Sequence, residues 1–150
     1  MELYFDLVLP RDRLTVPVVR HLFGASLARL GVAAGCIQEL ELAITEACSN
    51  ALKHATAGED QYEVTARVDG ATAEVTVTNA GANSKGEGPA LPQLDAEGGR
   101  GMLLMSHLVD QLSFKHHDDT TSVQLRKTLS LEEGSVLGRL APAGARAPTL

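Results

Sequence analysis

Two runs of alternating residues, separated by Asp69 and Gly70, constrain the fold of this chain more than any other feature. Every second residue in these runs is apolar, namely Val64, Ala66 and Val68 in the first and Val75 and Val77 in the second. Such alternation places the apolar side chains on one face of a strand, and Asp-Gly between two strands is typical of a tight hairpin turn. Residues 61–79 therefore predict a pair of antiparallel strands with one buried face.

The patterns around this hairpin predict further strands and three helices. The expected elements are a strand over residues 2–9 that stops at Pro10, helices over 14–30, 34–57 and 99–112, and strands over 113–118 and 121–129. On the first helix we expect the core side to carry Val18, Leu22, Leu27 and Leu30. Because strands and helices do not alternate strictly, the order favours an α/β two-layer sandwich, an α+β fold with helices on one face of a mixed, largely antiparallel sheet.

Length and composition indicate one globular domain. The chain has 150 residues, of which 44% are hydrophobic and 21% charged, so it contains enough apolar material for a core. We assign residues 1–131 to this domain. Residues from about 80 to 98 are rich in Gly and lack periodicity, which predicts a long functional loop. Residues 132–150 also lack periodicity, and we expect a disordered tail there.

Charge and hydropathy argue against several classes of partner. The formal net charge of −6 argues against direct nucleic-acid binding and against a polybasic membrane anchor. No apolar run is long enough to cross a bilayer and the N-terminus lacks a basic leader, so we expect a cytoplasmic protein. Cys36 and Cys48 lie on one predicted helix, about 18 Å apart along its axis, which is too far for a disulfide. We expect both to be buried thiols.

A polar stripe interrupts the apolar helix that contains "LAITEACSNALKHA". Glu46, Asn50 and His54 recur at intervals of four and therefore share one helix face, with Lys53 beside them. Carboxylate and amide oxygens suit a hard cation such as Mg²⁺, and a carboxylate here could also accept a proton from a hydroxyl. The alternative interpretation is an ordinary solvated helix face.

A glycine cluster, "GGRGM" at residues 98–102, lies immediately before another predicted helix. Backbone N–H groups at the start of a helix bind phosphate oxygens, and glycine lets an anion approach the backbone closely. The alternative is a flexible loop that leads into a helix. The cluster matches neither the P-loop pattern nor the dinucleotide fingerprint, since it lacks the Lys-Ser/Thr pair of the first and the preceding strand of the second.

Taken in order, these motifs resemble the GHKL (Bergerat-fold) superfamily of ATPases and kinases. The resemblance rests on "EACSNALKHA", the hairpin ending in "VTNAGAN", "GGRGMLLMSHLVDQL" and "TTSVQL", and covers about residues 3–129. It is closest to the small anti-sigma-factor serine-protein kinases, which carry a histidine-kinase-like ATPase domain. It implies a protein that uses ATP and Mg²⁺ to phosphorylate a serine of an anti-anti-sigma (STAS-type) antagonist. It also implies that the protein binds a sigma factor, often as a homodimer.

The resemblance also implies roles for individual residues. Asn50 matches the asparagine that holds Mg²⁺ on the ATP phosphates, and Glu46 matches the general base. Residues 82–97 match the ATP lid. The other implied nucleotide-binding positions are Lys53, His54, Asn79, Gly81, Gly98, Gly99, Arg100, Gly101, Met102, Thr121 and Ser122.

The sequence departs from the superfamily at the first glycine box. The superfamily reads Asp-x-Gly-x-Gly, whereas this chain has Asn79 and Asn83 at the first and last positions. Loss of the charge on the adenine acceptor would weaken binding by on the order of 1 kcal/mol. Two other consequences stay open at this point. The base preference could change, or nucleotide binding could be lost, which would leave a catalytically inactive partner-switching module.

Other chemistries have less support. His116 and His117 are neighbours on a predicted strand and so face opposite sides, and no His or Cys spacing matches a zinc site. Ser106 and His107 are helix neighbours that do not face each other, which argues against a serine hydrolase. We expect no sensor histidine kinase, since no dimerisation helix precedes the ATP-binding motifs. A regulatory ATP-binding subunit of a larger complex is a third interpretation.

Overall fold

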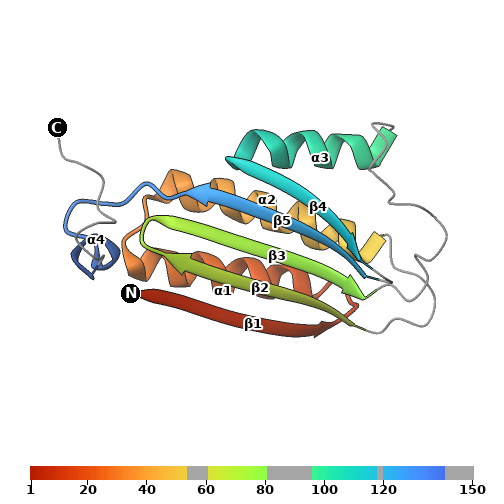
Figure 1. Cartoon of the computed structure of the whole chain (residues 1–150), viewed down its shortest axis with the longest axis horizontal. Coiled ribbons are helices and arrows are strands. Elements are labelled where there is room, and N and C mark those ends of the chain that lie inside the picture. The colour runs from red at the N-terminus through yellow and green to blue at the C-terminus, as the bar shows by residue number, and fades with distance from the viewer. Residues whose placement is uncertain (54–60, 81–95, 118–119, 141–150) are drawn as a thin grey trace.

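The computed structural model describes residues 1–53, 61–80, 96–117 and 120–140. Five strands form one sheet in the order β1-β2-β3-β5-β4, and every neighbouring pair is antiparallel. Helices α1, α2 and α3 cover one face of this sheet (Figure 1). The elements are β1 (Glu2–Pro10), α1 (Thr15–Leu30), α2 (Ala34–Lys53), β2 (Gln61–Asp69), β3 (Thr72–Ala80), α3 (Ala96–Leu108), β4 (Gln111–His117), β5 (Thr120–Thr128) and α4 (Val136–Leu140). The predicted two-layer sandwich is confirmed, with a wholly antiparallel sheet among the described strands.

The hairpin of β2 and β3 forms as its alternation predicts. Asp69 pairs with Thr72, and Gly70 between them has a φ of 61°, a left-handed value that favours glycine. The predicted inward residues of both strands are buried, and Tyr62 and Asn79 continue the same inner face toward the other end of the hairpin. The register of this hairpin therefore fixes which side chains of β3 reach the helical layer.

Helix α1 buries a face that overlaps only partly with the expected one, because Leu27 is buried and Leu30 packs against the core as predicted but Val18 and Leu22 do not. Val16, Val19, Phe23 and Leu27 are in the core, whereas Val18 and Leu22 are 56% and 39% exposed. Both sets have helical spacing, but only the buried set contains Phe23, whose ring lies 5.1 Å from the ring of Phe5 on β1. Burial of this aromatic pair sets the rotation of the helix, because aromatic side chains bury the largest apolar area.

Residues 132–140 are ordered, so the predicted boundary of the disordered tail is wrong there. Val32 and Leu131 form an isolated β-bridge, and the Glu132 N–H donates to the Gly31 carbonyl at 2.7 Å. Helix α4 follows, and its Leu137 is almost fully buried in the core. The sequence did not predict this helix, because one buried leucine in a five-residue helix shows no periodicity. Residues 141–150 lie outside the described residues.

Helix α3 also differs from its predicted limits. It begins at Ala96 rather than at residue 99, and it ends at Leu108 rather than at residue 112. The Asp110 N–H donates to the Arg126 carbonyl at 2.9 Å, and the Asp110 carboxylate accepts the Thr128 N–H at 2.6 Å. These bonds to β5 end the helix early, and they allow β4 to start at Gln111.

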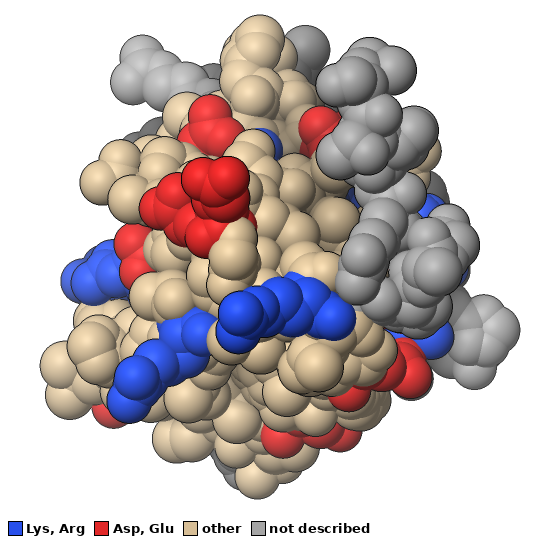
Figure 2. Space-filling view, turned by 90° about the vertical axis from the view of Figure 1, so that its left-hand side faces the viewer, with Lys and Arg blue, Asp and Glu red and all other residues tan. Residues whose placement is uncertain are grey.

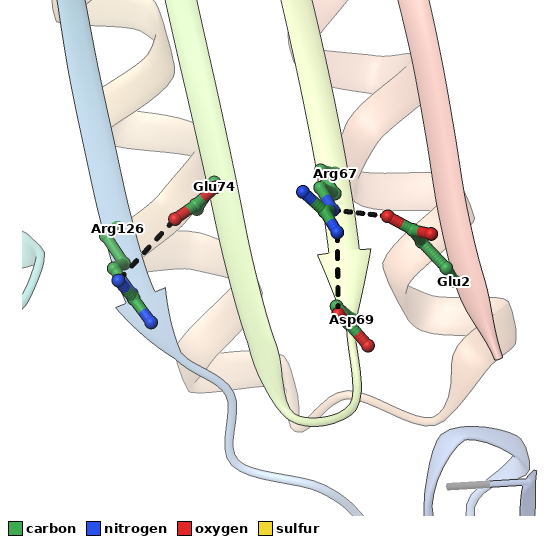
Figure 3. Close-up of polar contacts among 5 residues, drawn as sticks. All are labelled: Glu2, Arg67, Asp69, Glu74 and Arg126. Carbon is green, nitrogen blue, oxygen red and sulfur yellow. Dashed lines mark ion pairs between the residues drawn. The ribbon is translucent and has the colours of Figure 1, made fainter. Parts of the chain in front are cut away.

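The outer face of the sheet is mostly polar, although Tyr4 and Val8 of β1 are exposed on it. Arg67 on β2 pairs with Glu2 on β1 and with Asp69, and Arg126 on β5 pairs with Glu74 on β3 at 3.6 Å (Figure 3). These side chains are largely exposed, so each pair contributes little to stability. Their main effect is to keep this face solvated, opposite the helical layer.

Charges of both signs occupy the end of the molecule that carries the N-terminus and α4. Figure 2 shows acidic and basic side chains in separate groups among uncharged residues on this end. In the described part of the chain, no helix has the length and hydropathy needed to cross a membrane. Cys36 and Cys48 are both free and buried, as the helix spacing predicted.

Candidate functional site

Four elements meet at the end of the molecule opposite α4. The C-terminal end of α2, the start of α3, the end of β3 and the start of β5 lie there (Figure 1). The antiparallel register brings Asn79 of β3 opposite Thr121 of β5, although 42 residues separate them in the sequence. Residues of several predicted site motifs therefore gather at one end of the fold.

The polar stripe of α2 faces away from its core side. Ala47 and Ala51 are buried, whereas Glu46 and Asn50 are half-buried and Lys53 is exposed at the end of the helix. Half-burial leaves the carboxylate and the amide open to a ligand while the helix holds their direction. His54, the last residue of the predicted stripe, lies outside the described residues.

Asn79 is the most unusual polar residue at this end. Its side chain is only 7% exposed, and its Nδ2 donates to the Ala51 carbonyl at 3.3 Å. Its Oδ1 is buried and has no hydrogen-bond partner among the residues that the structure describes. A buried, unpaired acceptor is unfavourable by roughly 1–3 kcal/mol, and such atoms often indicate a ligand or water that binds there.

The Ala51 carbonyl fixes the orientation of the Asn79 amide. A carbonyl oxygen can only accept, so the amide must present Nδ2 to it and must turn Oδ1 away. The site therefore offers a hydrogen-bond acceptor at this point, not a donor. This orientation bears on a question that the sequence left open, because an asparagine alone could present either group to a ligand.

The two neighbouring hydroxyls of β5 face opposite sides of the sheet. Val123 and Leu125 point into the core, so Thr121 lies on the same inner face as Asn79. Ser122 lies on the outer face, where its Oγ is 3.1 Å from Thr78 Oγ1. The structure therefore places Thr121 on the inner face beside Asn79 and Ser122 on the outer face, so the two hydroxyls of the expected pair lie on opposite faces of the sheet.

The glycine cluster lies inside α3 and not before it. Because the helix starts at Ala96, Gly98 and Gly99 occupy its first turn, and Arg100 and Gly101 follow. The N–H groups of a first helical turn have no partner within the helix and can bind an anion. Met102 is buried in the core, so its side chain is a packing residue. Gly81 lies outside the described residues.

A set of buried contacts near this site was not predicted. Tyr62, the partner of Asn79 in the β2–β3 register, has its hydroxyl 2.6 Å from Thr15 Oγ1. Cys48 of α2 also influences the pKa of this hydroxyl. Burial raises the pKa of Cys48 to about 12. Burial is also the main cause that raises the pKa of Tyr62 to about 12. Both groups therefore stay protonated at neutral pH. Arg11 Nη2 donates to the Leu52 carbonyl at 2.6 Å. No periodicity or motif in the sequence marks these residues.

Comparison with known proteins identifies the family of this fold. Residues 9–127 match the model of the histidine kinase-like ATPase domain. The chain belongs to this family. The match spans both the polar stripe of α2 and the glycine cluster of α3, and it confirms the resemblance drawn from those motifs.

Several relatives of this histidine kinase-like ATPase domain are named serine-protein kinase RsbW. The Bacillus velezensis relative is 31% identical over 142 residues, which cover 86% of this chain and 88% of the relative. The Bacillus subtilis relative is 30% identical over 142 residues with the same coverage. The match therefore covers most of both proteins.

Solved structures confirm the fold of the domain. The structure of the RsbU and RsbW domains of a Mycobacterium tuberculosis protein matches 87% of this chain with a TM-score of 0.67 and 21% identity. This chain spans 33% of that longer protein. The histidine kinase domain of a blue-light activated kinase from Erythrobacter litoralis matches 89% of the chain with a TM-score of 0.50 and 18% identity. The arrangement expected of a Bergerat fold is thus present.

Proposed function

We propose that this protein is an ATP-dependent serine-protein kinase that also acts as an anti-sigma factor. It would sequester a sigma factor and phosphorylate a serine of a STAS-type antagonist. The observation that carries the ATP-binding part is the buried, unpaired Oδ1 of Asn79, which lies at the same end of the fold as the polar stripe of α2. The family and the named kinase relatives support the remainder.

The donor set at this end is suited to an adenine nucleotide. The 6-amino group of adenine is a donor and would satisfy Asn79 Oδ1, whereas guanine carries an acceptor at that position. Asn50 and Glu46 offer oxygen atoms of the kind that Mg²⁺ prefers. Within the described ranges, no group of three or more His, Cys, Asp or Glu side chains could hold a metal ion. Water molecules and phosphate oxygens of the nucleotide would supply the remaining ligands.

In the proposed mechanism each residue has one role. When bound, Mg·ATP would supply the γ-phosphoryl group and leave as ADP, and its metal would neutralise phosphate charge. Asn79 accepts a hydrogen bond from the base, and the Asn50 amide oxygen binds the cation. Glu46 orients the acceptor serine and accepts its proton. The first-turn N–H groups of α3, with Arg100, stabilise negative charge on the phosphates. Lys53, His54, Gly81, Gly101 and Thr121 complete the proposed nucleotide-binding set.

The structure gives a reason to prefer a binding-competent protein over an inactive module. An unpaired buried acceptor destabilises the folded state, and a ligand that donates to it would offset this cost, which favours a protein that binds one. A leucine or threonine at residue 79 would avoid the penalty. The proposed partners are a sigma factor and a STAS-type antagonist, in the cytoplasm, with a homodimer as the proposed assembly.

Calorimetric titration tests the proposal, with ATP and GTP each in the presence of Mg²⁺. We expect ATP to bind at least tenfold more tightly than GTP, since a site built for a donor leaves groups unpaired with the wrong base. Asn50→Ala should weaken Mg·ATP binding. Glu46→Ala should retain ATP binding and lose transfer of phosphate to the antagonist. Gln38→Ala is the matched control, since Gln38 is exposed near the other end of α2. Equal binding of both nucleotides, or none by either, would contradict the proposal.

A further inference from the structure

The last turn of α2 is held from two sides by side chains of other elements. Arg11, in the connection between β1 and α1, donates to the Leu52 carbonyl at 2.6 Å. Asn79, on β3, donates to the preceding carbonyl, that of Ala51, at 3.3 Å. Both acceptors are backbone carbonyls in the last turn of α2 that the structure describes, and a cation is favourable toward the C-terminal end of a helix. The same turn carries Asn50 and Lys53.

The connection that carries Arg11 is itself tied to β2 by a directed chain of hydrogen bonds. Thr15 Oγ1 donates its proton to the Asp12 carbonyl at 2.6 Å. The Tyr62 hydroxyl must then donate to Thr15 Oγ1, which it contacts at 2.6 Å. Asp12 Oδ1 also accepts the Leu14 N–H at 2.9 Å. The contacts thus run from β2 to the connection, and from the connection to α2 through Arg11.

From these contacts, we propose that Arg11 is a positioning residue that fixes the last described turn of α2 relative to Asn79. This inference rests on the proposed function, because it assigns the turn a ligand-binding role. Asn79 belongs to the sheet, and Asn50 belongs to the helical layer. A nucleotide that contacts both residues requires a fixed distance between the two layers. Arg11 holds that distance through the backbone of α2.

A direct role for Arg11 in binding phosphate is a different hypothesis with different consequences. A phosphate-binding arginine would contribute to ATP binding whether or not Mg²⁺ is present. A positioning residue that acts on the Asn50 turn would contribute mainly when Mg²⁺ is present. The dependence of ATP affinity on Mg²⁺ therefore separates the two roles.

Hydrogen exchange on the nucleotide-free protein tests the anchor itself. Arg11→Ala should raise amide exchange at residues 50–53 by about tenfold, since a charged hydrogen bond that opposes fraying is lost. Arg11→Lys keeps a cation and a donor and should recover most of the protection. Arg13→Ala is the matched control, because Arg13 is exposed in the same connection. Exchange in Arg11→Ala that equals exchange in Arg13→Ala would overturn the inference, whatever the protein binds.

Calorimetry then tests the consequence of the anchor for the site. In the wild type, Mg²⁺ should tighten ATP binding, and in Arg11→Ala that gain should fall by about tenfold while Mg²⁺-free ATP affinity stays within about twofold. If Arg11→Ala loses ATP affinity equally with and without Mg²⁺, the positioning role is overturned and a phosphate contact is indicated. If Arg11→Ala does not fold, Arg11→Gln, which keeps an N–H donor, replaces it in both measurements. If the wild type binds no ATP, the proposed function fails, and the exchange result still decides whether Arg11 anchors the helix.

Discussion

The two ends of the sheet each hold a buried polar side chain, but the two differ in how they are paired. Near α4, Lys127 is 9% exposed and its ammonium has two partners. At the opposite end, Asn79 is 7% exposed and its amide oxygen has no partner among the described residues. Lys127 Nζ donates to the Leu108 carbonyl at 2.7 Å and pairs with Glu39 at 2.9 Å. These contacts join α3, α2 and β5. The two buried polar residues are thus equally removed from water, but only one of them is satisfied by the protein.

This difference separates a structural role from a binding role. A buried polar group that the protein pairs itself stabilises one arrangement of the elements. A buried polar group that stays unpaired destabilises the free protein and becomes favourable only when a ligand supplies the partner. The end near α4 should therefore respond to mutation through stability, and the opposite end should respond mainly through ligand binding.

The largest expected effect lies at Gly31, in the end near α4. Gly31 ends α1 with a φ of 90°, and a Cβ on it would lie 2.3 Å from Ser135 Cβ and 2.8 Å from Ser135 Cα. Gly31→Ala should lower the free energy of unfolding by about 2–4 kcal/mol, because it adds left-handed strain to a backbone clash. Thermal unfolding followed by circular dichroism measures the change.

Gly35→Ala is the matched control for this glycine. Gly35 lies in the first turn of α2, and a Cβ there meets nothing within 4 Å. This variant should be neutral or more stable by about 0.5–1 kcal/mol, since alanine is the better helix former. Equal stability of the Gly31 and Gly35 variants would mean that residues 131–137 do not pack on the end of α1.

A pair of substitutions tests the contrast between Lys127 and Asn79 directly. Lys127→Met should lower the free energy of unfolding by about 1–3 kcal/mol, because it leaves the Leu108 carbonyl without its donor. Asn79→Ala should change it by less than about 1 kcal/mol, since one weak hydrogen bond and one unpaired acceptor disappear together. Chemical denaturation gives both values.

The same pair should behave in the opposite way toward ATP. Asn79→Ala should weaken ATP binding by about tenfold or more, whereas Lys127→Met should leave it within about twofold. Lys115→Met serves as a control for the loss of a lysine, because Lys115 is exposed on β4. If Asn79→Ala were clearly destabilised and bound ATP normally, the distinction between the two ends would be wrong.

The sequence contained most of the fold but only part of the site. The alternation predicted the hairpin and its inner face correctly, because a one-residue shift in strand register would expose all the apolar side chains. The same rule implies that Thr121 and Ser122 face opposite sides, although the resemblance to a family grouped them. Periodicity could not choose between the two apolar faces of α1, since contact of Phe23 with Phe5 decides the rotation. It could not find Arg11 either, since a hydrogen bond to a distant carbonyl leaves no local pattern.

The smallest expected effect concerns the pH dependence of the end near α4. The Thr128 N–H bound to the Asp110 carboxylate lowers the pKa of Asp110, with a further contribution from nearby Lys127. A carboxyl group with a lowered pKa in the folded state stabilises the protein above its unfolded pKa, and this stabilisation disappears as pH falls through the folded pKa.

Asp110→Asn removes the titrating group. The stability advantage of the wild type over this variant should therefore be largest near about pH 6 and should shrink toward about pH 3. Urea denaturation at several pH values measures it, with Glu133→Gln as a control because Glu133 is exposed in the same end of the molecule. A constant difference across this range would mean that the carboxylate charge does not stabilise the junction of α3 and β5, and that the hydrogen-bonded backbone alone holds it.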